Sequence, residues 1–184
     1  MGTSAEVAVK NESVILGGGC FWCTESVFLA VRGVQEVVPG YSGGRIDNPS
    51  YERVCRGDTG HVEVVRVTFD PDVVSLETLL EIFFATHDPA SLNRQGADEG
   101  TQYASVVFYG NSRQKEIAEQ VMARVAQSLG SKLVTRLELA PQFWPAEGYH
   151  HDYYAKHPQQ GYCQVVISPK MAKLRKKFAP LLQS

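Results

Sequence analysis

The order of the expected strands and helices constrains the fold of this chain more than any other feature of its sequence. Apolar runs with strand or helix periodicity follow one another as β-α-β-β-α-β-α-β, and a tail comes after them. One pair of neighbouring strands is joined by a loop, which favours an antiparallel or mixed sheet over a doubly wound parallel one. We therefore predict an α+β fold: a mixed sheet with a split βαβ (ferredoxin-like) core, helices packed on it and a long irregular C-terminal segment.

The expected elements can be placed along the chain by their periodicity and by the turn residues between them. The expected strands cover residues 13–16, 34–38, 62–69, 102–109, 133–139 and, in the tail, 164–167. The expected helices cover residues 20–31, 75–86, 112–129 and 170–182, and residues 142–158 are expected to form a short helix with loops. We predict a single domain over residues 1–184, with residues 1–11 as a flexible lead-in and residues 142–184 as a C-terminal extension.

Charge and hydrophobicity exclude several classes of function. The formal net charge of −2 gives no reason to expect nucleic acid or another polyanion as a partner. No apolar run reaches membrane-spanning length, and the first ten residues lack the basic and apolar segments of a signal peptide. We therefore expect a cytoplasmic protein, in a compartment where paired cysteines are more often catalytic or metal-binding than structural.

A cysteine stands where the first expected strand turns into the first expected helix. Three glycines at residues 17–19 precede Cys20, and the free N–H groups of a helix start stabilise an anion. We therefore expect Cys20 to be a thiolate of lowered pKa and the attacking group. Phe21 and Trp22 follow directly and suit an apolar substrate group. The alternative is a buried cysteine in an aromatic core.

Cys23 completes a C-x-x-C pair with Cys20, and this pair is ambiguous on its own. It is compatible with a dithiol redox pair, as in a general disulfide oxidoreductase, and with half of a zinc site. A zinc-stabilised interaction domain would need two further ligands, and no second knuckle stands at a usual spacing. We therefore expect no bound metal.

Glu63 lies near the start of a strand that is otherwise rich in valine. Strand alternation places it on the same face as Val65 and Val67. If this is the core face, burial raises the pKa of the carboxyl group and keeps it protonated near neutral pH, ready to donate a proton. The alternative is a solvated strand end.

Two tyrosines and an aspartate form a third group of candidates. Tyr51 lies in the long loop over residues 39–60, and Tyr103 stands at the start of an expected strand. A phenol can hydrogen-bond a polar oxygen while its ring packs against apolar groups, although either tyrosine could be a packing residue only. Asp98 has the sequence context of a turn residue.

Three residues outside these groups also have expected positions. Cys163 follows a glycine on a segment that we expect to be mobile, so it is suited to swing toward Cys20; the alternative is an ordinary buried cysteine. His87 is expected to satisfy carbonyl groups at a helix C-terminus. For His150 a capping or surface role is favoured over metal binding.

Taken together, the motifs resemble those of the peptide methionine sulfoxide reductase A family from about residue 15 to residue 163. Each motif is weak alone, and the set in this order is specific. The motifs are Gly19-Cys20-Phe21-Trp22, Gly40-Tyr41-Ser42-Gly43-Gly44, Asn48-Pro49-Ser50-Tyr51, Val54-Cys55, Gly57-Asp58-Thr59-Gly60-His61-Val62-Glu63, His87-Asp88-Pro89, Leu92-Asn93-Arg94-Gln95-Gly96, Asp98, Gly100-Thr101-Gln102-Tyr103 and Gly161-Tyr162-Cys163.

The resemblance implies a single catalytic domain and a role for each candidate. Cys20 would attack the sulfoxide sulfur and Glu63 would protonate its oxygen. Tyr51, Tyr103 and, through water, Asp98 would hold and polarise that oxygen, and Phe21 and Trp22 would cradle the S-methyl group. The chain would then be a peptide-methionine (S)-S-oxide reductase that needs no cofactor and repairs free or protein-bound methionine sulfoxide.

The same resemblance implies a second cysteine and an external reductant. The sulfenic acid formed on Cys20 would be resolved to a disulfide, which thioredoxin would reduce. Cys163 is the preferred resolving thiol, because attack by the alternative, Cys23, would compete with the aromatic pocket; a relay through both is also possible. A monomer is expected. The chain departs from the family pattern at Gly148, where an acidic residue is usual, and at His151, where glutamine is usual.

Overall fold

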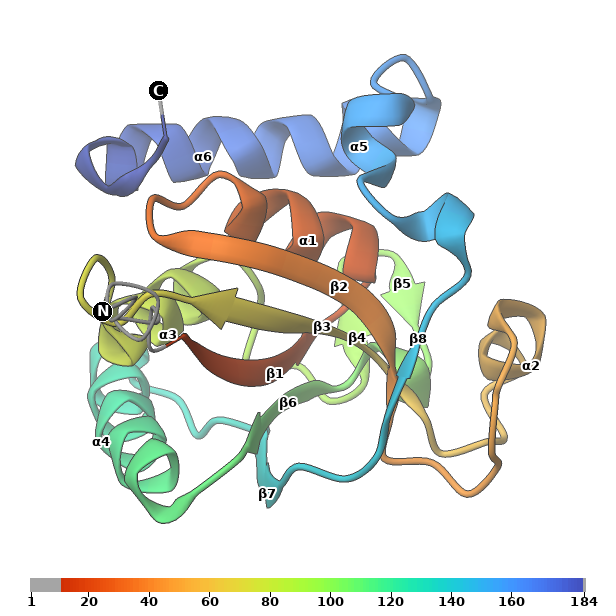
Figure 1. The fold of residues 1–184 in the computed structure, drawn as a ribbon, viewed down its shortest axis with the longest axis horizontal. Coiled ribbons are helices and arrows are strands. Elements are labelled where there is room, and N and C mark those ends of the chain that lie inside the picture. Colours follow the sequence, from red (N-terminus) through yellow and green to blue (C-terminus); the bar gives the residue numbers. More distant parts are fainter. Residues whose placement is uncertain (1–10, 184) are drawn as a thin grey trace, which may run out of the picture.

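The computed structural model describes residues 11–183, so the expected lead-in lies almost wholly outside the described residues. The elements, in chain order, are β1 (Glu12–Gly18), α1 (Phe21–Leu29), β2 (Val34–Ser42), α2 (Tyr51–Cys55), β3 (Val62–Phe69), α3 (Leu76–Ala85), β4 (Arg94–Gln95), β5 (Asp98–Glu99), β6 (Ser105–Tyr109), α4 (Ser112–Leu129), β7 (Arg136–Leu139), β8 (Phe143–Pro145), α5 (Tyr153–Lys156) and α6 (Ser168–Phe178). Figure 1 shows the sheet at the centre, with α1 and then α6 stacked above it.

The strand order of the main sheet confirms the predicted fold class. Its six strands lie in the order β7-β6-β1-β3-β2-β8. β1 and β2 flank β3 and both run antiparallel to it, and the connection between them is α1. In the same way β3 and β6 flank β1 and are connected through α3. These are two interlocked split βαβ units, and the parallel pairing of β6 with β7 makes the sheet mixed.

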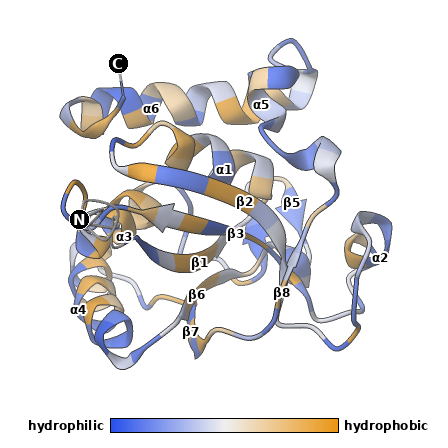
Figure 2. Cartoon of the chain, viewed as in Figure 1, coloured by the Kyte–Doolittle hydropathy of each residue, from blue (hydrophilic) through white to orange (hydrophobic). Residues whose placement is uncertain are grey.

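The two faces of the sheet are covered unequally. The face that carries Leu16, Val65 and Val67 belongs to the larger core, to which α1, α3, α4 and, packed on α1, α6 contribute the other side chains. The opposite face carries a smaller cluster that includes Ile15 and Val106. Figure 2 shows apolar stretches along the central strands and α1, whereas apolar and polar positions alternate along α4 and α6. A buried site beside α1 is therefore built from side chains on the sheet face that carries the larger core.

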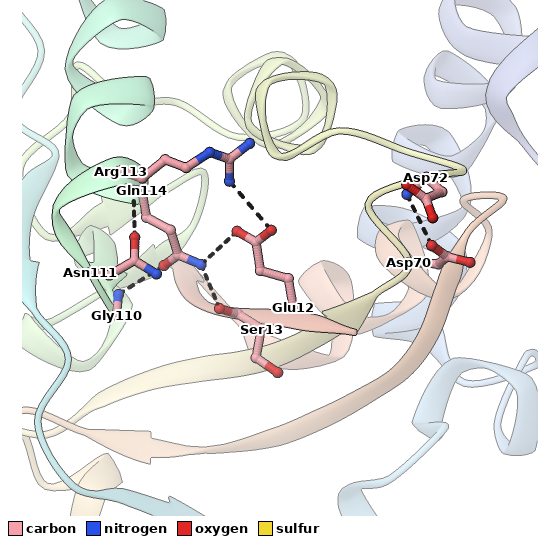
Figure 3. Close-up of polar contacts among 8 residues, drawn as sticks. All are labelled: Glu12, Ser13, Asp70, Asp72, Gly110, Asn111, Arg113 and Gln114. Carbon is pink, nitrogen blue, oxygen red and sulfur yellow. Dashed lines mark hydrogen bonds and ion pairs between the residues drawn. The ribbon is translucent and has the colours of Figure 1, made fainter. Parts of the chain in front are cut away.

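A polar staple joins the first strand to the fourth helix (Figure 3). Gln114 donates from Nε2 to Glu12 Oε2 (3.0 Å) and to the Ser13 carbonyl (2.9 Å), and it accepts from the Gly110 N–H at 2.8 Å. Asn111 caps α4 by accepting from the Gln114 N–H. The beginning of β1 is thereby fixed to α4, and β1 leads directly into the turn that carries Cys20.

The structure corrects three expectations of secondary structure, two of them in the C-terminal part of the chain. Residues 164–167 were expected to form a strand and instead lie in a π-helical stretch, Cys163–Ile167, that continues into α6. Cys163 and Ile167 are fully buried while Val165 is 75% exposed, so the apolar period is helical. The segment over residues 142–158 contains the expected short helix, α5, and also strand β8, which was not expected and pairs with β2. The expected strand at 102–109 begins only at Ser105, after a 3₁₀ turn at Thr101–Tyr103.

Candidate active site

Cys20 lies at the N-cap of α1, where the glycine turn after β1 ends. Its carbonyl accepts the N–H of Cys23 at 3.0 Å, and the residue is 8% exposed. Gly19 before it has φ +99°, and a Cβ there would stand 2.7 Å from Gln95 Cγ. Glycine is therefore required for the close approach of the β4–β5 hairpin to the turn. The predicted position of Cys20 at the strand-to-helix junction is confirmed.

The expected lowering of the Cys20 pKa is wrong for this reduced site. Burial, the neighbouring Cys23 and Glu63 all raise the pKa of the Cys20 thiol well above its usual value. The helix start does not offset this, because no backbone N–H donates to the Cys20 side chain. The interaction with Cys20 lowers the pKa of Cys23 instead, which makes Cys23 the more acidic thiol of the pair.

Glu63 projects from β3 onto the larger core face, as the strand pattern predicted. It is 1% exposed, and its Oε1 accepts the N–H of Phe21 at 3.1 Å, which places the carboxyl group one residue from Cys20. Burial raises its pKa to about 8 against the opposing effect of that hydrogen bond. Among residues 11–183 the other oxygen, Oε2, has no partner. Glu63 is thus a buried, protonated acid with one free oxygen.

Four rings from three parts of the chain pack together beside Cys20, some stacked and some tilted, and we call them the aromatic cluster: Phe21, Trp22, Tyr51 and His150. The ring centroids of Phe21 and Tyr51 lie 6.2 Å apart, and those of Tyr51 and His150 lie 4.4 Å apart. Trp22 is half-buried and stacks on Tyr153 at 3.8 Å, nearly parallel. The cluster thus brings together Phe21 and Trp22, which were expected to contact the S-methyl group, and Tyr51, which was expected to bind the sulfoxide oxygen.

His150 was expected to have a surface or capping role, and the structure corrects this. It is fully buried in the aromatic cluster, and its Nδ1 accepts the Trp22 indole N–H at 3.0 Å. Burial lowers its pKa, which keeps the ring neutral and able to accept. The indication in the sequence was the aromatic density of residues 143–154, although nothing local named Trp22 as the partner.

Glu147 holds the loop that carries Tyr51, a role that the sequence did not reveal. Its Oε2 accepts the Tyr51 N–H at 2.9 Å, and its Oε1 accepts the Tyr41 hydroxyl at 2.8 Å.

Tyr51 and Tyr103 both have raised pKa values, mainly because of burial and to a smaller extent because of the electrostatic effect of Glu63. The structure therefore places both expected tyrosines around Glu63 as neutral phenols.

Asp98 is hydrogen-bonded to Tyr162, a residue for which the sequence predicted no separate role. Asp98 lies on β5, and its Oδ2 accepts the Tyr162 hydroxyl at 2.6 Å. The same hydroxyl lies 3.7 Å from Cys23 Sγ, and the Tyr162 ring stands edge-on to Trp22 at 5.8 Å. The Tyr162 hydroxyl therefore connects Asp98 directly with Cys23 of the thiol pair.

The four cysteines are all free thiols, and they differ in exposure. Cys163 is fully buried in its helical turn and donates to Gln160 Oε1 at 3.6 Å, which is the alternative of an ordinary buried cysteine. The expected movement toward Cys20 stays a prediction. Cys55 is exposed. In the described part of the chain no three metal-ligating side chains gather, and no helix there is long and apolar enough to span a membrane.

Comparison with known proteins agrees with this site. The family model for peptide methionine sulfoxide reductase matches residues 12–181. The chain belongs to this family. Members of the peptide methionine sulfoxide reductase family are oxidoreductases, and the resemblance inferred from the motifs is confirmed.

Individual relatives support the same assignment. Peptide methionine sulfoxide reductase MsrA of Chromobacterium violaceum is 55% identical over 94% of this chain and 99% of its own length, and that of Saccharolobus solfataricus is 53% identical over 91% and 94%. Reduced Mxr1 from Saccharomyces cerevisiae has a TM-score of 0.78 at 33% identity, covering 85% of this chain and 91% of that chain. Mxr1 in complex with Trx2 matches at a TM-score of 0.55 and 20% identity over 79% and 86%, which shows the fold alone.

Proposed function

We propose that this single catalytic domain is a peptide-methionine (S)-S-oxide reductase in which Cys20 and Glu63 act on the sulfoxide together. The observation that carries the proposal is the hydrogen bond from Phe21 to Glu63, which fixes a protonated acid beside the thiol. A sulfoxide sulfur becomes a good electrophile only when its oxygen is protonated, so acid and nucleophile must reach the same group.

The proposed step balances with both groups protonated at the start. Cys20 Sγ bonds to the sulfoxide sulfur, Glu63 gives its proton to the sulfoxide oxygen, and the thiol proton passes to the Glu63 carboxylate. The hydroxyl group then moves from the substrate sulfur to Cys20 Sγ: the new Sγ–O bond forms while the substrate S–O bond and the bond between the two sulfurs both break. Methionine is released, reduced by two electrons, and Cys20 is oxidised to the sulfenic acid. The raised pKa values of both groups suit this exchange of protons.

The aromatic cluster, Tyr103 and Asp98 complete the proposed substrate site. Phe21 and Trp22 contact the S-methyl group, and the neutral phenols of Tyr51 and Tyr103 donate to the sulfoxide oxygen. Asp98, which accepts the Tyr162 hydroxyl through one carboxylate oxygen, holds the sulfoxide oxygen indirectly, through water.

For the resolving thiol we propose a relay, with Cys23 first and Cys163 second. Cys23 lies one helical turn from Cys20, a separation of about 5–6 Å that a disulfide can bridge, and it is the more acidic thiol. It attacks the sulfenic acid and releases water. Cys163 is buried in its helical turn, so it can exchange with this disulfide only after that turn opens. Thioredoxin then reduces the final disulfide, and the enzyme returns to protein repair.

The test combines one turnover with single cysteine variants. Wild type is treated with N-acetyl methionine sulfoxide of S configuration without reductant, and the disulfide is mapped by mass spectrometry. We expect methionine formation to be lost in Cys20→Ser, a Cys20–Cys23 disulfide in Cys163→Ser, and slow thioredoxin recycling in that variant. Full turnover by Cys20→Ser would overturn the function. A Cys20–Cys163 disulfide that forms equally fast in wild type and Cys23→Ser would overturn the relay and leave Cys163 as the direct resolving thiol.

A further inference from the structure

A groove of about 870 Å³ is lined by the two neighbouring thiols and by none of the four rings of the aromatic cluster. Besides Cys20 and Cys23, its lining comes from the C-terminal ends of α3 and α4 and from α6. Its volume falls within the range of roughly 300–1,000 Å³ typical of sites for ligands of drug size. One methionine side chain docked at Cys20 would leave most of this groove free.

Three lysines of α6 line this groove in a row: Lys170, Lys173 and Lys177. Their spacing of three and four residues puts them on one face of the helix. Lys170 is the lysine of this row that acts on the thiol pair, because, after the hydrogen bond from Cys20, its charge lowers the pKa of Cys23. Lys173 and Lys177 follow toward the C-terminus of α6 and are exposed. Within residues 11–183 none of the three forms an ion pair.

The carboxylates that line the same groove are already engaged within the chain. Glu81 pairs with Arg124 at 3.4 Å. Asp88 accepts the Ser91 hydroxyl at 2.6 Å and the Ala90 N–H, and Asp98 accepts the Tyr162 hydroxyl. Asp88 and Asp98 keep their negative charge, but their oxygens are occupied by donors within the chain, whereas the three lysines are available to pair with a bound molecule; the α6 side of the groove therefore favours a negatively charged group.

We propose that this groove binds the polypeptide that flanks the oxidised methionine and favours acidic residues a few positions away from it. The inference rests on the proposed function, since the groove matters only if the sulfoxide is reduced at Cys20. Lys170 to Lys177 spans about 10 Å of helix axis, which equals roughly three residues of extended peptide. Acidic side chains within about five residues of the methionine sulfoxide on one side can then reach the lysines.

The experiment measures kcat/KM for matched heptapeptides that contain one methionine sulfoxide, with dithiothreitol as reductant. Three residues on one side of the sulfoxide are glutamate, glutamine or lysine, in separate series for the N-terminal and C-terminal sides. For wild type we expect the glutamate peptide of one series to exceed the glutamine peptide about three- to tenfold, the sum of a few exposed charge pairs. The preference should shrink in high salt. Equal values for all peptides would overturn the proposal.

Two double variants separate the groove from the general charge of α6. Lys173→Glu with Lys177→Glu should abolish or reverse the preference for the glutamate peptide. Arg175→Glu with Lys176→Glu makes the same charge change on the same helix at exposed positions outside the groove, and it should keep the preference. A preference that survives in the first variant, or one lost equally in both, would overturn the role of the groove lysines.

A small substrate distinguishes a wrong peptide-groove proposal from a wrong proposal of sulfoxide reduction. N-acetyl methionine sulfoxide has no flanking residues, so both double variants of α6 should reduce it as fast as wild type does. If wild type does not reduce it, the proposed function is wrong. If the Lys173→Glu, Lys177→Glu variant changes only the KM for thioredoxin and not the peptide preference, the groove serves the reductant and the peptide proposal is wrong.

Discussion

Cys20 and Glu63 are held as a protonated pair before substrate arrives. Burial raises the pKa values of both groups, and the one hydrogen bond to Glu63 engages only Oε1. A thiolate and a carboxylate side by side in this desolvated space would repel each other, so the resting site is neutral. The proton that the sulfoxide oxygen needs is therefore stored next to the nucleophile.

Replacement of Glu63 by glutamine tests this pairing. The acid form donates, and it is present below a pKa of about 8, so the rate of sulfoxide reduction should fall as pH rises above 8. In Glu63→Gln we expect this descending limb to vanish and the rate to drop about 10²- to 10⁴-fold. The measurement is methionine formation in a single turnover between pH 6 and 10.

The matched control is Glu99→Gln, a neighbouring but exposed carboxylate that pairs with Arg94. It should leave both the rate and the pH profile unchanged. An unaltered descending limb in Glu63→Gln would show that another group donates the proton.

At the scale of elements, a buried carboxylate on α1 positions the turn before α5. Glu25 is 2% exposed and accepts the N–H groups of Asp152 (2.7 Å) and Tyr153 (3.3 Å). Burial raises its pKa to about 7 even though these hydrogen bonds favour the charged form. Because Tyr153 stacks on Trp22, Glu25 positions a neighbour of the aromatic cluster.

Glu25→Ala should therefore weaken substrate binding more than the chemical step. The change leaves two N–H groups without their acceptor, at a cost of about 1–3 kcal/mol in the free energy of unfolding. We expect the KM for N-acetyl methionine sulfoxide to rise severalfold with kcat changed less, and Tm to fall. Glu25→Gln, which retains an acceptor oxygen, should restore part of both. Glu119→Ala, an exposed change on α4, serves as control. A loss confined to kcat would contradict the positioning role.

At the scale of the whole molecule, two titratable groups make the free energy of unfolding depend on pH: His87 destabilises the fold at low pH, and Glu63 destabilises it at high pH. The pKa of His87 is lowered to about 4 by burial, while its ring bridges the Phe83 carbonyl and the Ser105 hydroxyl. The unfolded chain therefore binds a proton at this histidine between about pH 6.5 and 4 that the folded chain does not, and stability falls as pH falls through this range. Glu63 acts in the opposite direction.

For Glu63 the folded carboxyl keeps its proton up to about pH 8, whereas the unfolded one loses it near 4.5. Its contribution is fully present below pH 4.5 and is lost as pH rises toward 8. Between pH 6 and 8 the proton on Glu63 makes the free energy of unfolding of wild type fall by about 1.4 kcal/mol per pH unit. We expect this part of the slope to be absent in Glu63→Gln. Urea denaturation at several pH values measures this slope. Parallel slopes for wild type and variant would show that the buried carboxyl is already ionised.

Local patterns in the sequence were sufficient for the order of the long elements from β1 to β7, the turn that carries Cys20 and the inward orientation of Glu63. Each depends on residues a few positions apart, through strand alternation, helical spacing or glycine geometry. The short elements α2, β4, β5 and β8 were missed. The error at residues 164–167 arose because a short apolar run fits both a strand and a helix, and the buried pair Cys163 and Ile167 settles it only in the folded chain.

Tertiary structure alone decided the state of the site. The partners of Trp22, Cys23 and Glu25 are His150, Tyr162 and Asp152, which stand 128, 139 and 127 residues away in sequence. No local pattern specifies such pairs, because they form only when the C-terminal segment folds over α1. The pKa of Cys20 follows the same rule: a helix start in the sequence favours a thiolate, but burial beside Cys23 and Glu63 reverses that preference.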